Sequence, residues 1–167
     1  VVTTGTQPAG FLINHATGSS TIRGFAIGTD SNSGNRMAIS AQAGSGHHIA
    51  CNHLGLDAVG SAQLGSVAFS YMVTTELTAD GVIIGTNGDG VDDRAERNVF
   101  GPLAFAVSIN FNNNNRISGN YFGFTADGTS SVDATVVFIR QWSSNNLVGV
   151  DYDGVSDDIE PNYFGNT

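Results

Sequence analysis

The chain has 167 residues, about the size of one domain, with 15 acidic side chains against six arginines and no lysine, which gives a formal net charge of -9. Nucleic acid and anionic membranes are therefore poor partners, because both are bound through clustered cations. No run approaches the ~18 apolar residues of a membrane span. The chain begins at Val1 with no signal segment, so we expect a processed chain or a piece of a longer one.

The composition favours short strands joined by tight turns. Glycine accounts for 22 residues and proline for only three. No stretch carries apolar residues with the periodicity of an amphipathic helix, and the apolar runs are short, β-branched and bounded by Gly, Asn or Asp. The run 81–85 is an example. We therefore predict an all-β fold.

A recurring glycine predicts a solenoid. Along the chain, a glycine follows a strand-like apolar position at Gly28, Gly55, Gly85, Gly101, Gly123, Gly149 and Gly165. The spacings of 27, 30, 16, 22, 26 and 16 residues average near 23. That is about one turn of a three-sided β coil, with loops of different length at one corner. The prediction is a right-handed parallel β-helix of about seven rungs, forming one domain over residues 1–167.

The tetrapeptide Asn-x-[Leu/Phe]-Gly marks one corner of this predicted solenoid. Its four copies begin at Asn52, Asn98, Asn120 and Asn162. Asparagine tolerates a left-handed bend, and its amide group can donate to one neighbour while it accepts from the next. We therefore expect the four asparagines to stack as a structural ladder along the rungs, with ordinary turn asparagines as the alternative for any one of them.

A longer duplication accompanies the short repeat. Residues 84–101 align without gaps on residues 148–165, an offset of 64 residues that corresponds to nearly three predicted rungs. The segments 84–101 and 115–131 resemble the repeats of bacterial secreted and cell-surface parallel β-helix proteins, in which Asn-x-[Ile/Phe]-Gly units alternate with Asp-Gly-Val-x-Asp units. This resemblance covers residues 82–131 and 146–167 and is weak before residue 82.

The resemblance implies a location and a class of function. Proteins of this kind are often parts of large exported proteins with adhesive, structural or glycan-binding roles, while a minority of β-helix families are polysaccharide lyases or hydrolases. We accordingly expect an extracellular or cell-surface module that binds glycans or neighbouring copies of itself. Open end rungs would expose unpaired strand edges, which favours assembly into fibres.

The duplicated segments contain two acidic loops that resemble the later part of a calcium-binding loop. The candidate calcium ligands are Asn87, Asp89, Asp92, Asp93 and Glu96 in the first loop, and Asp151, Asp153, Asp157 and Glu160 in the second. Gly85 and Gly149 fall at the first ligand position, and neither offers a side-chain oxygen. The alternative is a pair of solvated turns whose carboxylates cap backbone amides, with Arg94 and Arg97 neutralising the charge.

A polysaccharide-acting enzyme is the competing hypothesis. Hydrolysis needs two carboxylates about 5 to 9.5 Å apart, and Asp92–Asp93 or Asp157–Asp158 could supply such a pair across rungs. The segments Gly46-His47-His48 and Arg116-Ile117-Ser118 match polygalacturonase motifs only in part. A lyase needs an Arg or Lys base, and lysine is absent. The sequence therefore favours a structural role and names no catalytic residue.

Two further side chains stand out because they are rare in this chain. Trp142 precedes a polar turn, so it is expected either to be partly buried as a cap or to stack against a sugar ring. Cys51 is the only cysteine and is expected to lie in the core as a small hydrophobic residue.

Overall fold

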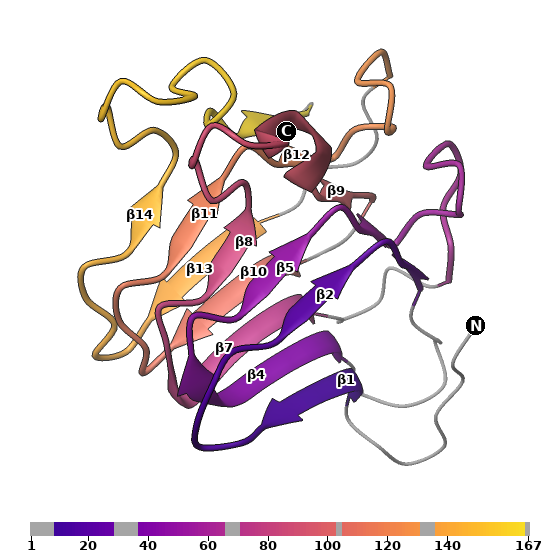
Figure 1. Ribbon diagram of the computed structural model, residues 1–167. Coiled ribbons are helices and arrows are strands. Elements are labelled where there is room, and N and C mark those ends of the chain that lie inside the picture. Colours follow the sequence, from indigo (N-terminus) through magenta and orange to yellow (C-terminus); the bar gives the residue numbers. More distant parts are fainter. Residues whose placement is uncertain (1–8, 29–36, 66–70, 103–104, 131–135, 166–167) are drawn as a thin grey trace.

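The computed structural model describes residues 9–28, 37–65, 71–102, 105–130 and 136–165, which form three five-stranded sheets (Figure 1). Sheet A contains β1 (Ala9–Asn14), β4 (Met37–Ser45), β7 (Tyr71–Asp80), β10 (Phe105–Asn110) and β13 (Val136–Arg140). Sheet B contains β2 (Thr21–Arg23), β5 (His48–Ala50), β8 (Ile83–Gly85), β11 (Arg116–Ser118) and β14 (Leu147–Val148). Sheet C contains β3 (Ala26–Ile27), β6 (His53–Leu54), β9 (Val99–Phe100), β12 (Tyr121–Phe122) and β15 (Tyr163–Phe164).

The strands are stacked as the rungs of a parallel β-helix. Every pair of neighbouring strands within the three sheets is parallel, and each rung takes one strand from each sheet in chain order. The predicted all-β parallel β-helix is therefore confirmed. The only helical segment among the described residues is the short 3-10 helix η1 (Asp93–Glu96). No helix in this part of the chain is long and apolar enough to cross a membrane.

The rung count is lower than the glycine spacing predicted. The described residues form five rungs rather than about seven. Five of the seven glycines follow strands of sheet C, but Gly85 and Gly149 lie at the ends of sheet B strands in rungs three and five. The glycine spacing counts Gly85 and Gly149 as separate rungs, although Gly101 and Gly165 already mark the same two rungs. The offset of 64 residues consequently spans two rungs, because long insertions at the corners lengthen both of them.

Gly85 shows why a glycine is required at such a strand end. Its φ of 99° lies in the left-handed region, which side chains with a Cβ rarely adopt. A Cβ at this position would also clash with the carbonyl oxygen of Ser118 and with the side chain of Asn120 in the next rung. The glycine therefore marks a close approach between rungs rather than the start of a new rung.

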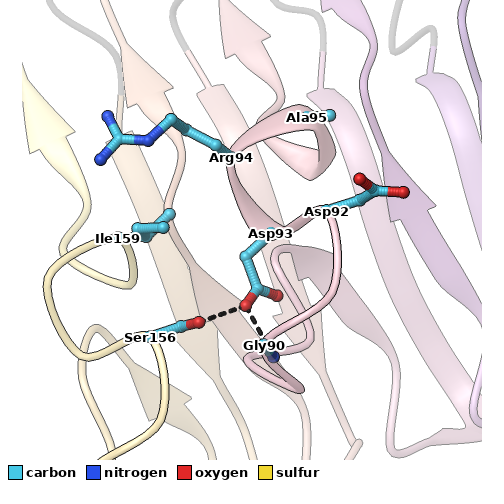
Figure 2. Close-up of a pocket in the computed structure, with 7 residues that line it drawn as sticks. All are labelled: Gly90, Asp92, Asp93, Arg94, Ala95, Ser156 and Ile159. Carbon is cyan, nitrogen blue, oxygen red and sulfur yellow. Dashed lines mark hydrogen bonds between the residues drawn. The ribbon is translucent and has the colours of Figure 1, made fainter.

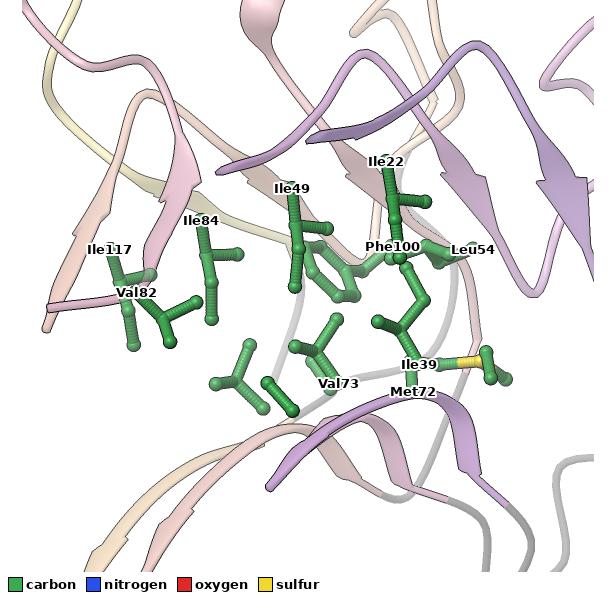
Figure 3. Close-up of a cluster of buried hydrophobic side chains, with 14 of the residues drawn as sticks. Ile22, Ile39, Ile49, Leu54, Met72, Val73, Val82, Ile84, Phe100 and Ile117 are labelled. Carbon is green, nitrogen blue, oxygen red and sulfur yellow. The ribbon is translucent and has the colours of Figure 1, made fainter. Parts of the chain in front are cut away.

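The core is built from columns of inward-facing side chains (Figure 3). In sheet B the register stacks four isoleucines in successive rungs, and each of them is at least nine-tenths buried: Ile22, Ile49, Ile84 and Ile117. In sheet C the rings of Phe100, Phe122 and Phe164 stack with successive centroid separations of 4.7 Å. Each inner member of a column packs against the rungs on both sides, so the phenylalanine column is exposed only at Phe164 in the last rung.

The phenylalanine column yields a stability prediction. Phe122 is 1% exposed between two other rings, whereas Phe164 at the end of the column is 46% exposed. Phe122→Ala is expected to lower the free energy of unfolding by about 3–5 kcal/mol, because a cavity between two rungs cannot collapse easily. Phe164→Ala is the matched control and should cost about half as much, since its lost area is already partly hydrated. Denaturant unfolding measures both, and equal costs would contradict the column as the source of stability.

Candidate functional site

The two acidic loops lie at the corner between sheets B and C. Loop 1 (residues 86–97) joins β8 to β9 in rung three, and loop 2 (residues 150–161) joins β14 to β15 in rung five. Both loops begin after a glycine with positive φ and end directly before a ladder asparagine. The gap-free alignment of the two segments thus corresponds to the same corner of the solenoid, two rungs apart.

Asp93 organises loop 1. It is buried, and its carboxylate accepts hydrogen bonds from the Thr86 hydroxyl at 2.6 Å and from the backbone amides of Gly88 at 3.2 Å and Gly90 at 2.9 Å. The Ser156 hydroxyl of loop 2 donates a further hydrogen bond to the same carboxylate (Figure 2). Asp93 therefore satisfies the donors of its own loop and connects the two loops.

The remaining polar side chains of loop 1 serve the local backbone. The side-chain amide of Asn87 donates a hydrogen bond of 2.9 Å to the Asp89 carboxylate, and each of the two side chains also accepts from a backbone amide two residues further on. Glu96 is buried and accepts from the Asn87 amide at 3.0 Å. Its other oxygen lies 3.9 Å from Nδ1 of His48, the first residue of β5 in rung two. Asp92 is exposed and has a left-handed backbone conformation.

Loop 2 is organised around an arginine. Glu160 is fully buried, and it accepts a hydrogen bond from the Asp151 amide at 3.0 Å and forms an ion pair with the Arg116 guanidinium. A second nitrogen of the same guanidinium lies 2.5 Å from the Asp151 carboxylate. Arg116 is the first residue of β11, so it reaches loop 2 from the neighbouring rung four. One cation therefore holds two carboxylates of the loop.

Glu96 and Glu160, the last acidic residues of their loops, are paired in the same way. Glu96 faces His48 and Glu160 faces Arg116, and in both cases the partner is the first residue of the sheet B strand one rung earlier. Sequence reasoning missed His48, Arg116 and Ser156, because these contacts cross between rungs whose register was not known. The alignment of Glu96 with Glu160 was the available signal, but their partners can be found only after the strands are assigned to rungs.

The loops also contact each other along a shallow hollow (Figure 2). Arg94 of loop 1 lies 3.7 Å from Asp158 of loop 2, and both side chains are largely exposed. Arg97 does not contribute to this charge neutralisation, because its side chain donates to the Gly119 carbonyl and lies over the ring of Tyr121. The residues that line the hollow are Gly90, Asp92, Asp93, Arg94, Ala95, Ser156 and Ile159.

The hydrogen bonds of the loops change the acidity of two carboxyl groups. Burial alone would raise the pKa of Asp93, but the hydrogen bonds from Ser156, Thr86 and the two glycine amides outweigh it and hold the pKa below its ordinary value. The hydrogen bond and charge of the Arg116 guanidinium lower the pKa of Asp151. Both groups are therefore anions in the folded chain near neutral pH.

The lowered pKa of Asp93 predicts acid-dependent stability. A carboxyl group with a lower pKa in the folded state stabilises the fold above its unfolded pKa of about 3.9, and the stabilisation is lost as pH falls through the folded pKa. Thermal unfolding between pH ~6 and ~2.5 should show the melting temperature falling in the acid part of this range. Asp93→Asn should flatten the fall and the exposed Asp92→Asn should not; identical profiles for the two variants would contradict this role of Asp93.

The carboxylates fit calcium only in part. Among the described residues, one group of side chains converges well enough to hold a metal ion, and it comprises Asp151, Asp157 and Glu160. The Arg116 guanidinium already neutralises part of the charge of this group, because it pairs with the carboxylates of Asp151 and Glu160. Asp153 lies outside this group and caps the Val155 amide. In loop 1 the acidic candidates Asp89, Asp92, Asp93 and Glu96 do not converge as such a group, and the side-chain amide of Asn87 donates to Asp89.

The four ladder asparagines lie in one column. The side-chain amide of Asn52 donates to Oδ1 of Asn98 at 3.0 Å, Asn98 donates to Asn120 at 3.0 Å, and Asn120 donates to Asn162 at 3.1 Å. The backbone amide of each donor also points to the same oxygen. Asn52, Asn98 and Asn120 are fully buried. The column therefore satisfies polar groups along the whole corner between sheets B and C.

A second column lies at the corner between sheets A and B. Asn115 donates from its side chain to Asn146 at 2.9 Å, and its own Oδ1 accepts from the Val82 amide at 2.9 Å. In rung two the equivalent residue is the buried His47, which accepts from the Ser20 amide at 3.0 Å. This column was not predicted, because it mixes residue types and the tetrapeptide does not mark it.

One of the two alternatives expected for Trp142 is wrong, and so is the prediction for Cys51. Trp142 is 86% exposed at a turn with a φ of 58°, so it is not partly buried as a cap. Cys51 is exposed and has a φ of 56° at the corner between β5 and β6, where the first and fourth rungs have Gly24 and Gly119. Both side chains are turned outwards because a left-handed corner residue cannot face the core.

Comparisons with protein-family models, with curated proteins and with solved structures found no match to this chain.

Proposed function

We propose that the chain is a structural module of the extracellular space or cell surface, in which the acidic loops fasten successive rungs together. The observation that carries the proposal is the use made of the loop carboxylates. Glu160 is fully buried against Arg116, and Asp93 is saturated by donors from both loops. Groups held in this way stabilise a solenoid and are not available to a substrate.

The same contacts disfavour the polysaccharide-acting alternative. A glycoside hydrolase needs one carboxyl group with a raised pKa to protonate the leaving group. The pKa of Asp93 is lowered instead, and Asp158 reaches across to Arg94 on the exposed rim of the hollow. Asp93 is therefore poorly suited to be the acid of a catalytic pair.

Two measurements test this proposal. An antibody against the chain should label intact cells of the source organism, or detect the chain in the medium, without lysis. The purified chain should release no reducing ends and no unsaturated uronides from a panel of acidic and neutral polysaccharides. Labelling that requires lysis would contradict the location, and saturable cleavage that persists in an Asp93→Asn, Asp157→Asn variant would place an unrecognised active site elsewhere.

As part of the same proposal, calcium stabilises the chain only weakly, because Arg116 already occupies the place of a cation in loop 2. A ligand that binds only the folded state raises its stability by mass action, so thermal unfolding with calcium and with a chelator measures the effect directly. We expect a small shift for the native chain, because the guanidinium already neutralises Asp151 and Glu160. A rise of many degrees at millimolar calcium would instead support loop 2 as a calcium site.

Glycan binding is the second candidate function, and the exposure of Trp142 favours it. An indole that is 86% exposed offers a flat apolar face of the kind that packs against sugar rings. Binding of the chain to a glycan array, compared with Trp142→Ala, tests this role. Leu77→Ala is the control, because Leu77 is also exposed and has a similar left-handed backbone. Binding that is equal in all three proteins would contradict it.

A further inference from the structure

We propose that Asn87 in loop 1 is a site of spontaneous deamidation, and that Asp93 holds this reaction back by binding the backbone amide of Gly88 while the loop is closed. The inference concerns the chemical lifetime of the chain and does not depend on the proposed structural role. Asn87 and Gly88 form the only Asn–Gly pair in the sequence. Glycine is the following residue that permits deamidation most readily, because no side chain shields its amide nitrogen and its backbone has the widest conformational range.

The reaction joins the two residues through the backbone. The amide nitrogen of Gly88 loses its proton to hydroxide from the solvent and attacks Cγ of the Asn87 side chain. A bond forms between these two atoms, the bond from Cγ to the side-chain nitrogen breaks, and that nitrogen takes up a proton and leaves as ammonia. Water then opens the imide ring at either carbonyl, which leaves aspartate or isoaspartate at position 87. The reaction therefore needs a Gly88 amide that is free to turn and to lose its proton.

In the closed loop the Gly88 amide is not free. It is buried, and it donates to the Thr86 hydroxyl oxygen at 3.0 Å and to a carboxylate oxygen of Asp93 at 3.2 Å. The other oxygen of Asp93 accepts from the Gly90 amide and the Ser156 hydroxyl, which fixes the carboxylate in place (Figure 2). A deprotonated amide beside this buried carboxylate would bring two negative charges together, so its formation is strongly disfavoured.

The side chain that would be attacked is held as well. The Asn87 amide group donates to the Asp89 carboxylate at 2.9 Å, and its oxygen accepts from the Asp89 backbone amide at 3.0 Å. The Gly88 backbone also lies so close to the ion pair of Arg116 and Glu160 that a Cβ at this position would clash with both. Attack on Cγ requires these contacts to be released. Deamidation is therefore expected only when loop 1 opens, at a rate that follows the open fraction.

The comparison with loop 2 shows what deamidation would do to loop 1. The residue of loop 2 that aligns with Asn87 is Asp151, which has no side-chain amide to lose and whose carboxylate is paired with Arg116. Asn87 faces the Asp89 carboxylate instead. A carboxylate at position 87 would repel Asp89 where the amide now donates a hydrogen bond. We therefore expect deamidation to keep loop 1 from closing again, so that its contacts with loop 2 are lost irreversibly.

Peptide mass spectrometry of the full chain, incubated in mildly alkaline buffer, measures the conversion at position 87. We expect the native chain to convert at least about tenfold more slowly than the chain unfolded in guanidinium. Asp93→Ala removes the carboxylate that binds the Gly88 amide, so it should speed conversion at least about tenfold over the native chain. Asp92→Ala is the matched control, because Asp92 is exposed in the same loop, and it should convert like the native chain.

Two results would overturn the inference. Native conversion as fast as that of the unfolded chain means that the closed loop gives no protection. Conversion in folded Asp93→Ala that equals the native rate means that Asp93 is not the protecting group. Thermal unfolding shows whether each variant is folded during the incubation. If Asp93→Ala is not, Thr86→Val replaces it, because it removes the other acceptor of the Gly88 amide; a smaller acceleration is expected there, and none would equally overturn the inference.

The substitution Asn87→Asp, which supplies one of the two products directly, tests the consequence for the loop. Hydrogen exchange should show the amides of Gly88 and Gly90 exchanging faster than in the native chain, because the loop no longer stays closed. Unchanged exchange would show that the altered loop still closes, and it would overturn the irreversible loss of the contacts between the loops.

Discussion

Replacing Arg116 by methionine is expected to lower the free energy of unfolding by about 3–5 kcal/mol. The change keeps most of the side-chain volume but removes the only cation that contacts Glu160 among the described residues. Glu160 is fully buried and would have to remain charged without a partner or take up a proton. Denaturant unfolding at neutral pH measures the loss.

A second substitution isolates the cause of that loss. Arg116→Met combined with Glu160→Gln removes both charges, and it should recover much of the stability because no buried carboxylate is left unpaired. Arg94→Met is the control for a loop arginine in water, since Arg94 and its partner Asp158 are largely exposed, and it should change stability by less than about 1 kcal/mol. Equal losses for Arg94→Met and Arg116→Met would contradict a structural role for the buried pair.

The asparagine motif allowed the column of four asparagines to be foreseen, because it fixes a side chain relative to a strand. In each copy the asparagine directly precedes a two-residue strand of sheet C, so its position at the corner does not depend on the length of the connection before it. The number of rungs does depend on those lengths. Loop 1 and loop 2 lengthen their rungs at one corner, and glycines on both sides of this corner were therefore counted separately.

The candidate site illustrates which contacts a single sequence hides. The acidic residues and their duplication were visible, but not the partners that decide what the carboxylates do. Arg116 is 44 positions from Glu160 along the chain, and His48 lies in rung two, one rung before the loop that contains Glu96. Predicting such pairs requires the register of sheet B first, because a shift by one residue turns each strand's first side chain to the other face.

Replacing Asn120 by alanine is expected to cost about 3–5 kcal/mol, the second large effect in this fold. The change deprives the amide and side chain of Asn98 of their shared acceptor. It also removes the side-chain donor to the carbonyls of Ile84 and Ser118 at 2.8 and 3.0 Å, although the Ser118 carbonyl keeps the Thr86 amide as a partner. Each of these groups is buried where water cannot replace the lost partner, and an unsatisfied buried polar group costs about 1–3 kcal/mol.

Asn162, at the end of the ladder, provides the control for this prediction. Asn162 makes the same kinds of hydrogen bond, to Asn120 and to the Ile117 carbonyl, but it lies half-buried in the last rung. Asn162→Ala should therefore cost only about 1–2 kcal/mol, because water can reach the groups that it leaves behind. Denaturant unfolding of both variants measures the difference. If Asn120→Ala cost no more than Asn162→Ala, the ladder would stabilise the chain through its turn conformation, and burial of its amides would have no part in it.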